Sequence, residues 1–399
     1  MTTRWDPPDP RQLPEWRADM VEHLAAPSTL ATMKEAIHAG RCTIVPTVPG
    51  MDASPGAVGA TILTRCEARR LREAELYYAT ADMTALALAA AASPPTEPVS
   101  LSRLPSEYGL IVFAEPIGGY TEDVGAALAA TPFGTPGASA QITTPIVAAS
   151  WSAWDPSEVQ LDQGATVQWT FRSNAASGIL PPDYSGIWLT FYSPRGLFSG
   201  LAPDTVIGTM ADGMVMTAGD IDAHRETHGP QLNWDNEMLL SEGAPFGPPP
   251  PDTTQTWAQV IYTAWQLMSQ TGQTRWAEVE EVPRPRAGAK RDRRQGITGS
   301  SAVRIVRVHA TQRPAPQAAR EDAQASTGRR EPQWSCRWPV RPYRRNTCLN
   351  PRGHADGSCR HEDRIVPGHI KGPEGAPLRT GSTVHLWDRQ PDEGAGLSG

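Results

Sequence analysis

The chain has 399 residues and a formal net charge of −7, and 39% of its residues are hydrophobic. This length accommodates about two to three domains with a sizeable core. Its longest apolar run, near residues 85–92, is far shorter than the ~20 residues of a membrane-spanning helix. The first residues lack a signal-peptide pattern, and five cysteines, an odd number, argue against a secreted disulfide scaffold. We therefore expect a globular cytoplasmic protein without a membrane partner.

Charge is distributed unevenly along the chain. Residues 1–280 contain 14 basic and 31 acidic side chains, whereas residues 281–399 contain 22 basic and 12 acidic ones. Such asymmetry predicts a C-terminal segment that faces a polyanion. Two alternatives stay open: the basic part packs against the acidic body, or the preference for arginine (33 Arg, 3 Lys) reflects only a GC-rich genome.

The first 240 residues show short helices and several strands. We expect an irregular segment over residues 1–16, then an acidic α+β domain with a mixed sheet over 17–240. Apolar spacing predicts helices over 28–40, over an Arg/Glu-rich stretch at 62–75, and over 83–92 with Asp82 as its N-cap. Strands are predicted at 42–48, 76–79, 109–114, 145–151, 167–171 and 187–192. The spacing of the last four strands is typical of a sheet built from hairpins rather than from strict βαβ units.

The remainder of the chain alternates ordered and linker-like composition. Residues 241–280 contain a proline spacer and an amphipathic helix over 252–272, capped by Asp252 or Thr253. A disordered basic linker is expected over 281–300, because charged residues there follow no period. A small basic β-rich module is then expected over 301–389, beginning with a strand at 302–310 and containing a flexible insertion at 311–333. Residues 390–399 are expected to form a disordered tail.

The basic module holds the candidate binding residues. Guanidinium groups pair with phosphate, and aromatic rings stack on unpaired bases. The pattern predicts contact with RNA or a ribonucleoprotein, and docking on an acidic protein partner is the alternative. The candidates are Arg337, Trp338, Arg341, Tyr343, Arg344, Arg345, Arg364, His369 and Lys371.

Two further chemistries are open in the same module. Two thiolates and two imidazoles could form a tetrahedral structural zinc site from Cys348, His354, Cys359 and His361. The set lacks a C-x-x-C pair, so these residues could equally be scattered, and Cys348 and Cys359 could form a disulfide in an oxidising setting. A less favoured interpretation is a metal-dependent nuclease site formed by His361, Glu362 and Asp363. Because no phosphate-binding loop, nucleophile elbow or kinase motif is present, a non-enzymatic protein is expected.

The C-terminal motifs also resemble a known group of proteins. They are Arg337-Trp338-x-Val340-Arg341-x-Tyr343-Arg344 and His369-Ile370-Lys371-Gly372-Pro373-x-x-x-Pro377-Leu378. They are similar to a module in uncharacterised phage and plasmid proteins, within the broad family of the type V-A anti-CRISPR inhibitor. The likeness touches residues 70–115 and 300–387. It implies a non-enzymatic regulator of a mobile element that recognises a nascent polypeptide and promotes loss of its message.

Overall fold

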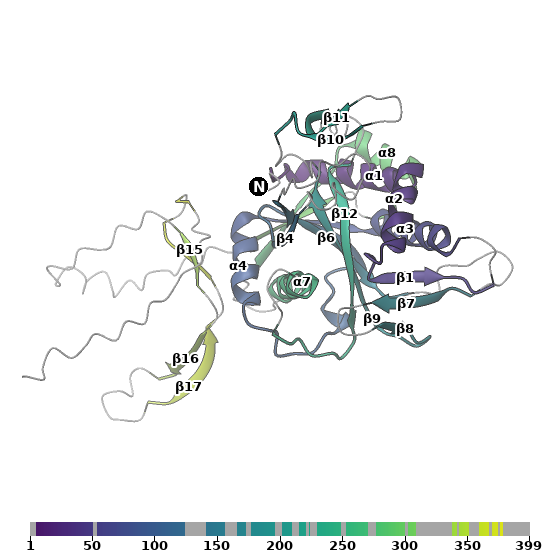
Figure 1. Ribbon diagram of the computed structural model, residues 1–399. Coiled ribbons are helices and arrows are strands. Elements are labelled where there is room, and N and C mark those ends of the chain that lie inside the picture. Colours follow the sequence, from purple (N-terminus) through teal and green to yellow (C-terminus); the bar gives the residue numbers. More distant parts are fainter. Residues whose placement is uncertain are drawn as a thin grey trace, which may run out of the picture.

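The computed structural model shows a central body from which C-terminal strands extend (Figure 1). None of the helices in the part of the chain that it describes has both the length and the apolar character needed to cross a membrane. The described residues are 5–50, 54–123, 141–155, 166–172, 177–195, 202–209, 215–220, 223, 230–248, 253–269, 277–299, 302–308, 337–340, 343–350, 359–366, 369–373 and 376–377.

A seven-stranded mixed sheet forms the centre of the body, which confirms the α+β class. Its order is β12-β9-β6-β3-β2-β14-β13. Strands β14, β2 and β3 run parallel, and each of the other pairings is antiparallel. The strands are β2 (Glu75–Ala79), β3 (Tyr108–Phe113), β6 (Ala148–Ala153), β9 (Gly186–Pro194), β12 (Leu232–Ser241), β13 (Ala277–Val282) and β14 (Val303–Val308).

Helices cover both faces of this sheet. They are α1 (Leu13–Leu24), α2 (Pro27–His38), α3 (Pro55–Glu73), α4 (Ala81–Ala91), α7 (Thr254–Met268) and α8 (Arg286–Arg294), with short 3-10 turns at Pro10–Gln12 and Leu101–Arg103. Successive strand residues enter opposite cores: Ile111 and Phe113 of β3 pack with α4 and α7, whereas Leu110 and Val112 pack with α1 and α3. The continuous apolar run therefore forms a strand that is buried on both faces.

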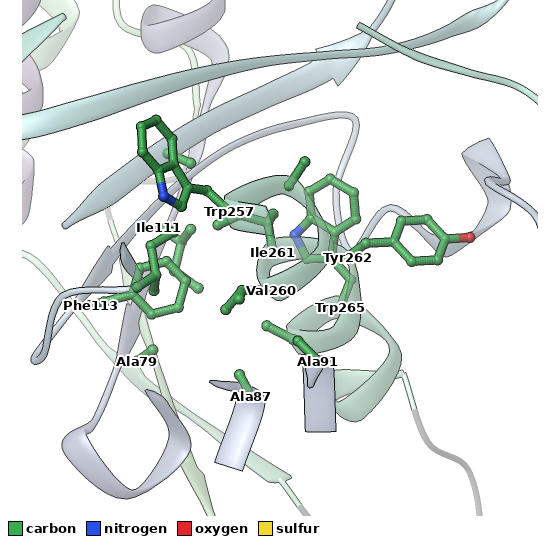
Figure 2. Close-up of a cluster of buried hydrophobic side chains, with 14 of the residues drawn as sticks. Ala79, Ala87, Ala91, Ile111, Phe113, Trp257, Val260, Ile261, Tyr262 and Trp265 are labelled. Carbon is green, nitrogen blue, oxygen red and sulfur yellow. The ribbon is translucent and has the colours of Figure 1, made fainter. Parts of the chain in front are cut away.

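Helix α7 supplies the largest side chains of one core. Trp257, Ile261 and Trp265 are at most 3% exposed, and Figure 2 shows them beside α4 and β3. Burying each such side chain contributes roughly 2–3 kcal/mol. Thr253 caps the helix through its side-chain oxygen, which accepts from the Thr256 N–H, so the predicted helix over 252–272 is present within slightly narrower bounds.

Smaller sheets complete the described fold. One is a three-stranded sheet in the order β1 (Ile44–Thr47), β7 (Gln168–Arg172) and β8 (Ser177–Ile179). The pairs are β4 (Gly118–Asp123) with β5 (Gln141–Ile146), and β10 (Val206–Thr209) with β11 (Val215–Thr217). Near the C-terminus, β15 (Trp338–Val340) pairs with β18 (His369–Lys371), and β16 (Tyr343–Cys348) pairs with β17 (His361–Val366).

One local expectation was wrong. The N-cap of α4 is Thr80 rather than Asp82, because the Thr80 oxygen accepts from the Met83 N–H and Asp82 already lies in the first turn. Strands β3, β6 and β9 pair antiparallel, as their hairpin-like spacing predicts, whereas β2 and β3 are parallel neighbours joined through α4. A parallel connection needs a crossover, and the apolar helix α4 provides it.

Several expected boundaries also differ from the structure. The segment 1–16 is not wholly irregular, since α1 begins at Leu13, and the segment 281–300 contains helix α8 rather than a disordered linker. Strand β14 lies inside the main sheet, so neither 17–240 nor 301–389 is a separate unit, and β13 from the 241–280 segment forms an edge of that sheet. The change of charge near residue 281 therefore does not mark a domain boundary. The expected insertion at 311–333 and the tail at 390–399 lie outside the described residues.

Candidate functional site

Part of the basic C-terminal charge is neutralised within the body, beginning at α8. Arg284 contacts Glu15 of α1 at 2.7 Å and Asp292 at 3.4 Å. Arg291 bonds both Glu15 and Asp19, the latter at 2.7 Å. These partners hold α8 against α1, and they explain why a charged segment without apolar periodicity forms an ordered helix.

The arginines of β14 are neutralised in the same way. Arg304 reaches Glu75 at 2.8 Å and Glu281 at 3.3 Å, and Arg307 reaches Glu280 at 3.0 Å. The carboxylates come from β2 and β13, the two strands that pair with β14. For α8 and β14, the charge asymmetry of the sequence therefore reflects complementary surfaces within one fold.

Arg337, a predicted binding residue, is also engaged by the body. Its Nη1 lies 2.5 Å from Asp82 Oδ2 on α4, and its Nε donates to the Ala376 carbonyl at 2.7 Å. Its backbone N–H donates to the Pro377 carbonyl at 2.9 Å. The Arg337 guanidinium therefore links the C-terminal strands to α4, and it stays 25% exposed.

The short pair β15–β18 brings together other predicted residues. Trp338 is the register partner of Lys371, and Val340 is the partner of His369. Lys371 is exposed and His369 is half-buried. Arg341 lies outside the described residues.

The hairpin β16–β17 concentrates the remaining candidates. Arg345 lies directly opposite Arg364, and one step along each strand Arg344 lies opposite Ile365. Two steps from the arginine pair, Tyr343 lies opposite Val366. The register therefore brings the backbone positions of Arg345 and Arg364 together, with Tyr343 two steps along the same strand from Arg345. Like charges that lie directly opposite each other destabilise a sheet unless an anion neutralises them.

The proposed zinc ligands lie near the other end of this hairpin. Cys348 is the register partner of His361, and Cys359 precedes His361 by two residues. Cys348 and Cys359 are half-buried free thiols in the structure. His354 lies outside the described residues. Among the residues that the structure describes, no three His, Cys, Asp or Glu side chains gather as a metal-binding group.

The three residues of the nuclease interpretation lie on one strand of this hairpin. His361, Glu362 and Asp363 are consecutive residues of β17. The nuclease interpretation stays a prediction.

A buried polar network, which the sequence interpretation missed, lies inside the body. Glu67 of α3 accepts from Arg70 at 2.6 Å, from Ser150 at 2.7 Å and from Thr190 at 3.0 Å, and also from the hydroxyl of Tyr192. The sequence indicates an Arg/Glu-rich helix over 62–75, and the structure buries two of its charged side chains, Glu67 and Arg70. Both carboxylate oxygens are satisfied and the group is fully buried, so this network stabilises the fold and is inaccessible to a ligand.

A second buried carboxylate, Glu237 of β12, joins the central sheet to β1. Its Oε1 accepts from the N–H groups of Thr43 and Ile44 at 2.7 and 3.2 Å, and its Oε2 accepts from the Trp234 indole at 3.1 Å. Burial, the largest influence, raises the pKa of Glu237 from 4.5 to about 7 despite these donors. The carboxylate therefore changes charge near neutral pH.

Comparisons with protein families, with curated proteins and with solved structures find no match for this chain.

Proposed function

We propose that this protein is a non-enzymatic regulatory protein that binds RNA or a ribonucleoprotein through the hairpin β16–β17. The observation that carries the proposal is the register of Arg345 opposite Arg364. A phosphate between two guanidinium groups relieves their repulsion and accepts charge-assisted hydrogen bonds from both. Tyr343, two steps from Arg345 on the same strand, offers a ring on which an unpaired base stacks. Single-stranded RNA supplies both the phosphate and the unpaired base.

The C-terminal motifs support a more specific setting for this activity. Their resemblance to the family of the type V-A anti-CRISPR inhibitor suggests a regulator carried by a phage or plasmid and acting in the host cytoplasm. Its target would then be a ribonucleoprotein complex that displays a nascent chain. Co-purification of the tagged full chain from a translating extract, with and without ribonuclease, tests this setting. Recovery of ribosomes that ribonuclease treatment abolishes supports it, and recovery of no ribosomes contradicts it.

The hairpin itself is tested by binding of the full chain to fluorescent single-stranded RNA across a salt series. The double variant Arg345→Gln with Arg364→Gln should weaken binding and lower the slope of log K against log salt by about 1.4, since each phosphate contact on a single strand contributes about 0.7. A matched control is Arg103→Gln with Arg307→Gln, which removes two half-exposed body arginines paired with Glu97 and Glu280. Equal losses in both double variants, or no binding by the unmodified chain, would refute the proposal.

A second candidate is a zinc-stabilised hairpin that mediates protein contacts. The specific observation that favours it is the register of Cys348 opposite His361, with Cys359 two residues away. Thiolate and imidazole ligands held by one hairpin suit a structural zinc ion. Metal analysis of the purified chain should then find about one zinc per molecule, lost in Cys348→Ala and retained in Cys66→Ala. A chain without zinc would exclude this candidate.

A further inference from the structure

The first turn of α4 lies at the carboxyl end of the parallel part of the main sheet. It follows the carboxyl end of β2, between the parallel neighbours β3 and β14. Thr80 fixes this turn, because its N–H donates to the Val306 carbonyl at 3.2 Å and its side chain caps α4. In open sheets, ligands bind outside the carboxyl ends of parallel strands. Asp82 stands in this turn and gives it a negative charge.

C-terminal strands lie against this turn. We call the described residues from 337 to 377 the arm. Strands β15 and β18 of the arm contact α4, and Figure 1 shows β15 beside it with hairpin β16–β17 beyond. The Arg337–Asp82 ion pair joins arm and helix at 2.5 Å. About a quarter of each side chain is exposed, at 25% and 28%, so solvent and ions reach the pair.

We propose that the Arg337–Asp82 pair is a latch that holds the arm on α4, and that RNA bound by the arm opens this latch. The release step rests on the proposed function; the docking step does not. An RNA backbone that binds Arg345 and Arg364 brings negatively charged phosphates to the same arm. These phosphates compete with the Asp82 carboxylate for Arg337. Docking and RNA binding then oppose each other, and by linkage each weakens the other by the same factor.

The geometry sets the size of the effect. A partly exposed ion pair changes an equilibrium constant by at most about five-fold, so the latch is weak enough to open under mild competition. Removing the pair should therefore raise the population of undocked arm and strengthen RNA binding by about two- to five-fold. Added salt should also raise the population of undocked arm, because it screens exposed charge pairs.

Hydrogen–deuterium exchange of the full chain without RNA tests the docking step. Asp82→Asn and Arg337→Gln should each accelerate exchange in peptides from the first turn of α4 and from β15. Glu97→Gln is the matched control, because it removes one exposed carboxylate that pairs with Arg103 and not with the arm. The charge swap Asp82→Arg with Arg337→Asp should restore protection. Exchange in Asp82→Asn equal to that in Glu97→Gln would overturn the latch, whether or not RNA binds.

RNA affinity of the same variants tests the release step. Asp82→Asn should bind single-stranded RNA about two- to five-fold more tightly than Glu97→Gln, and bound RNA should accelerate exchange in the first turn of α4 of the unmodified chain. Equal RNA affinities of the two variants would overturn release while leaving the proposed function intact. Absence of RNA binding by the unmodified chain would instead refute the proposed function and release together, and the exchange data without RNA would still decide docking.

Discussion

The substitution Glu237→Gln should remove a pH dependence from the stability of this protein. The Glu237 carboxyl has a pKa of about 7 in the folded chain against 4.5 as its ordinary value, and burial is the main cause. Glu67, the other buried carboxylate nearby, adds to this rise. The folded state therefore holds the proton more tightly than the unfolded state does.

The sign and size of the effect follow from this difference. The contribution of Glu237 to the free energy of unfolding is fully present below pH 4.5 and is lost as the pH rises through about 7. A difference of this size corresponds to about 3 kcal/mol at roughly 1.4 kcal/mol for each pH unit. A glutamine carries no charge at any pH, and it keeps an oxygen that can accept from Thr43 and Ile44.

Urea unfolding followed by tryptophan fluorescence at pH 5 and pH 8 measures this contribution. The unmodified chain should lose about 2.5 kcal/mol more than Glu237→Gln between the two pH values, because the unfolded-state carboxyl is already partly ionised at pH 5. Other groups also titrate in this window, so the difference between variants is the informative quantity. Glu97→Gln, which removes an exposed carboxylate, should keep the slope of the unmodified chain. Parallel pH profiles for Glu237→Gln and the unmodified chain would refute the reasoning.

Two further substitutions test the interior, both by urea titration at constant pH. Arg70→Leu should lower the free energy of unfolding by about 3–5 kcal/mol, because it leaves the buried Glu67 carboxylate without its cation; a loss below about 1 kcal/mol would contradict the assigned network. Gly109→Ala should cost about 1–3 kcal/mol, since a Cβ there would lie 2.0 Å from the Trp151 ring, whereas Gly247→Ala meets no atom within 4 Å and should be nearly neutral. Equal effects of the two glycine substitutions would refute the packing argument.

Local patterns predicted the elements whose stability is set by burial. The apolar run at 109–114 forms β3, which is buried on both faces. The tryptophans and aliphatic residues that recur every three or four residues over 252–272 form α7. In both, the residues that determine the element lie next to one another in the sequence. Elements fixed by distant partners were not predictable in this way. Helix α8 depends on Glu15 and Asp19, which precede it by about 270 residues.

The candidate site was predictable in composition but not in arrangement. The sequence shows that arginines and aromatics cluster after residue 336, and it does not show that Arg337 contacts Asp82 or that Arg345 faces Arg364. The first contact depends on how the C-terminal strands dock on α4, and the second depends on the register of the hairpin. The spacing of residues in the sequence determines neither. A shift of one residue in the hairpin would exchange the two faces.

The place of β14 in the sheet has a consequence for synthesis of the chain. Strand β2 leaves the ribosome early, yet its neighbour β14 follows more than 220 residues later and packs between β2 and β13. Until that strand arrives, one edge of β2 stays open, with apolar Leu76 and Tyr78 beside it. An open apolar edge favours pairing with other chains. A chain ended near residue 280 should consequently aggregate during expression, and a nascent chain is expected to need a holding chaperone until residue 308 has emerged.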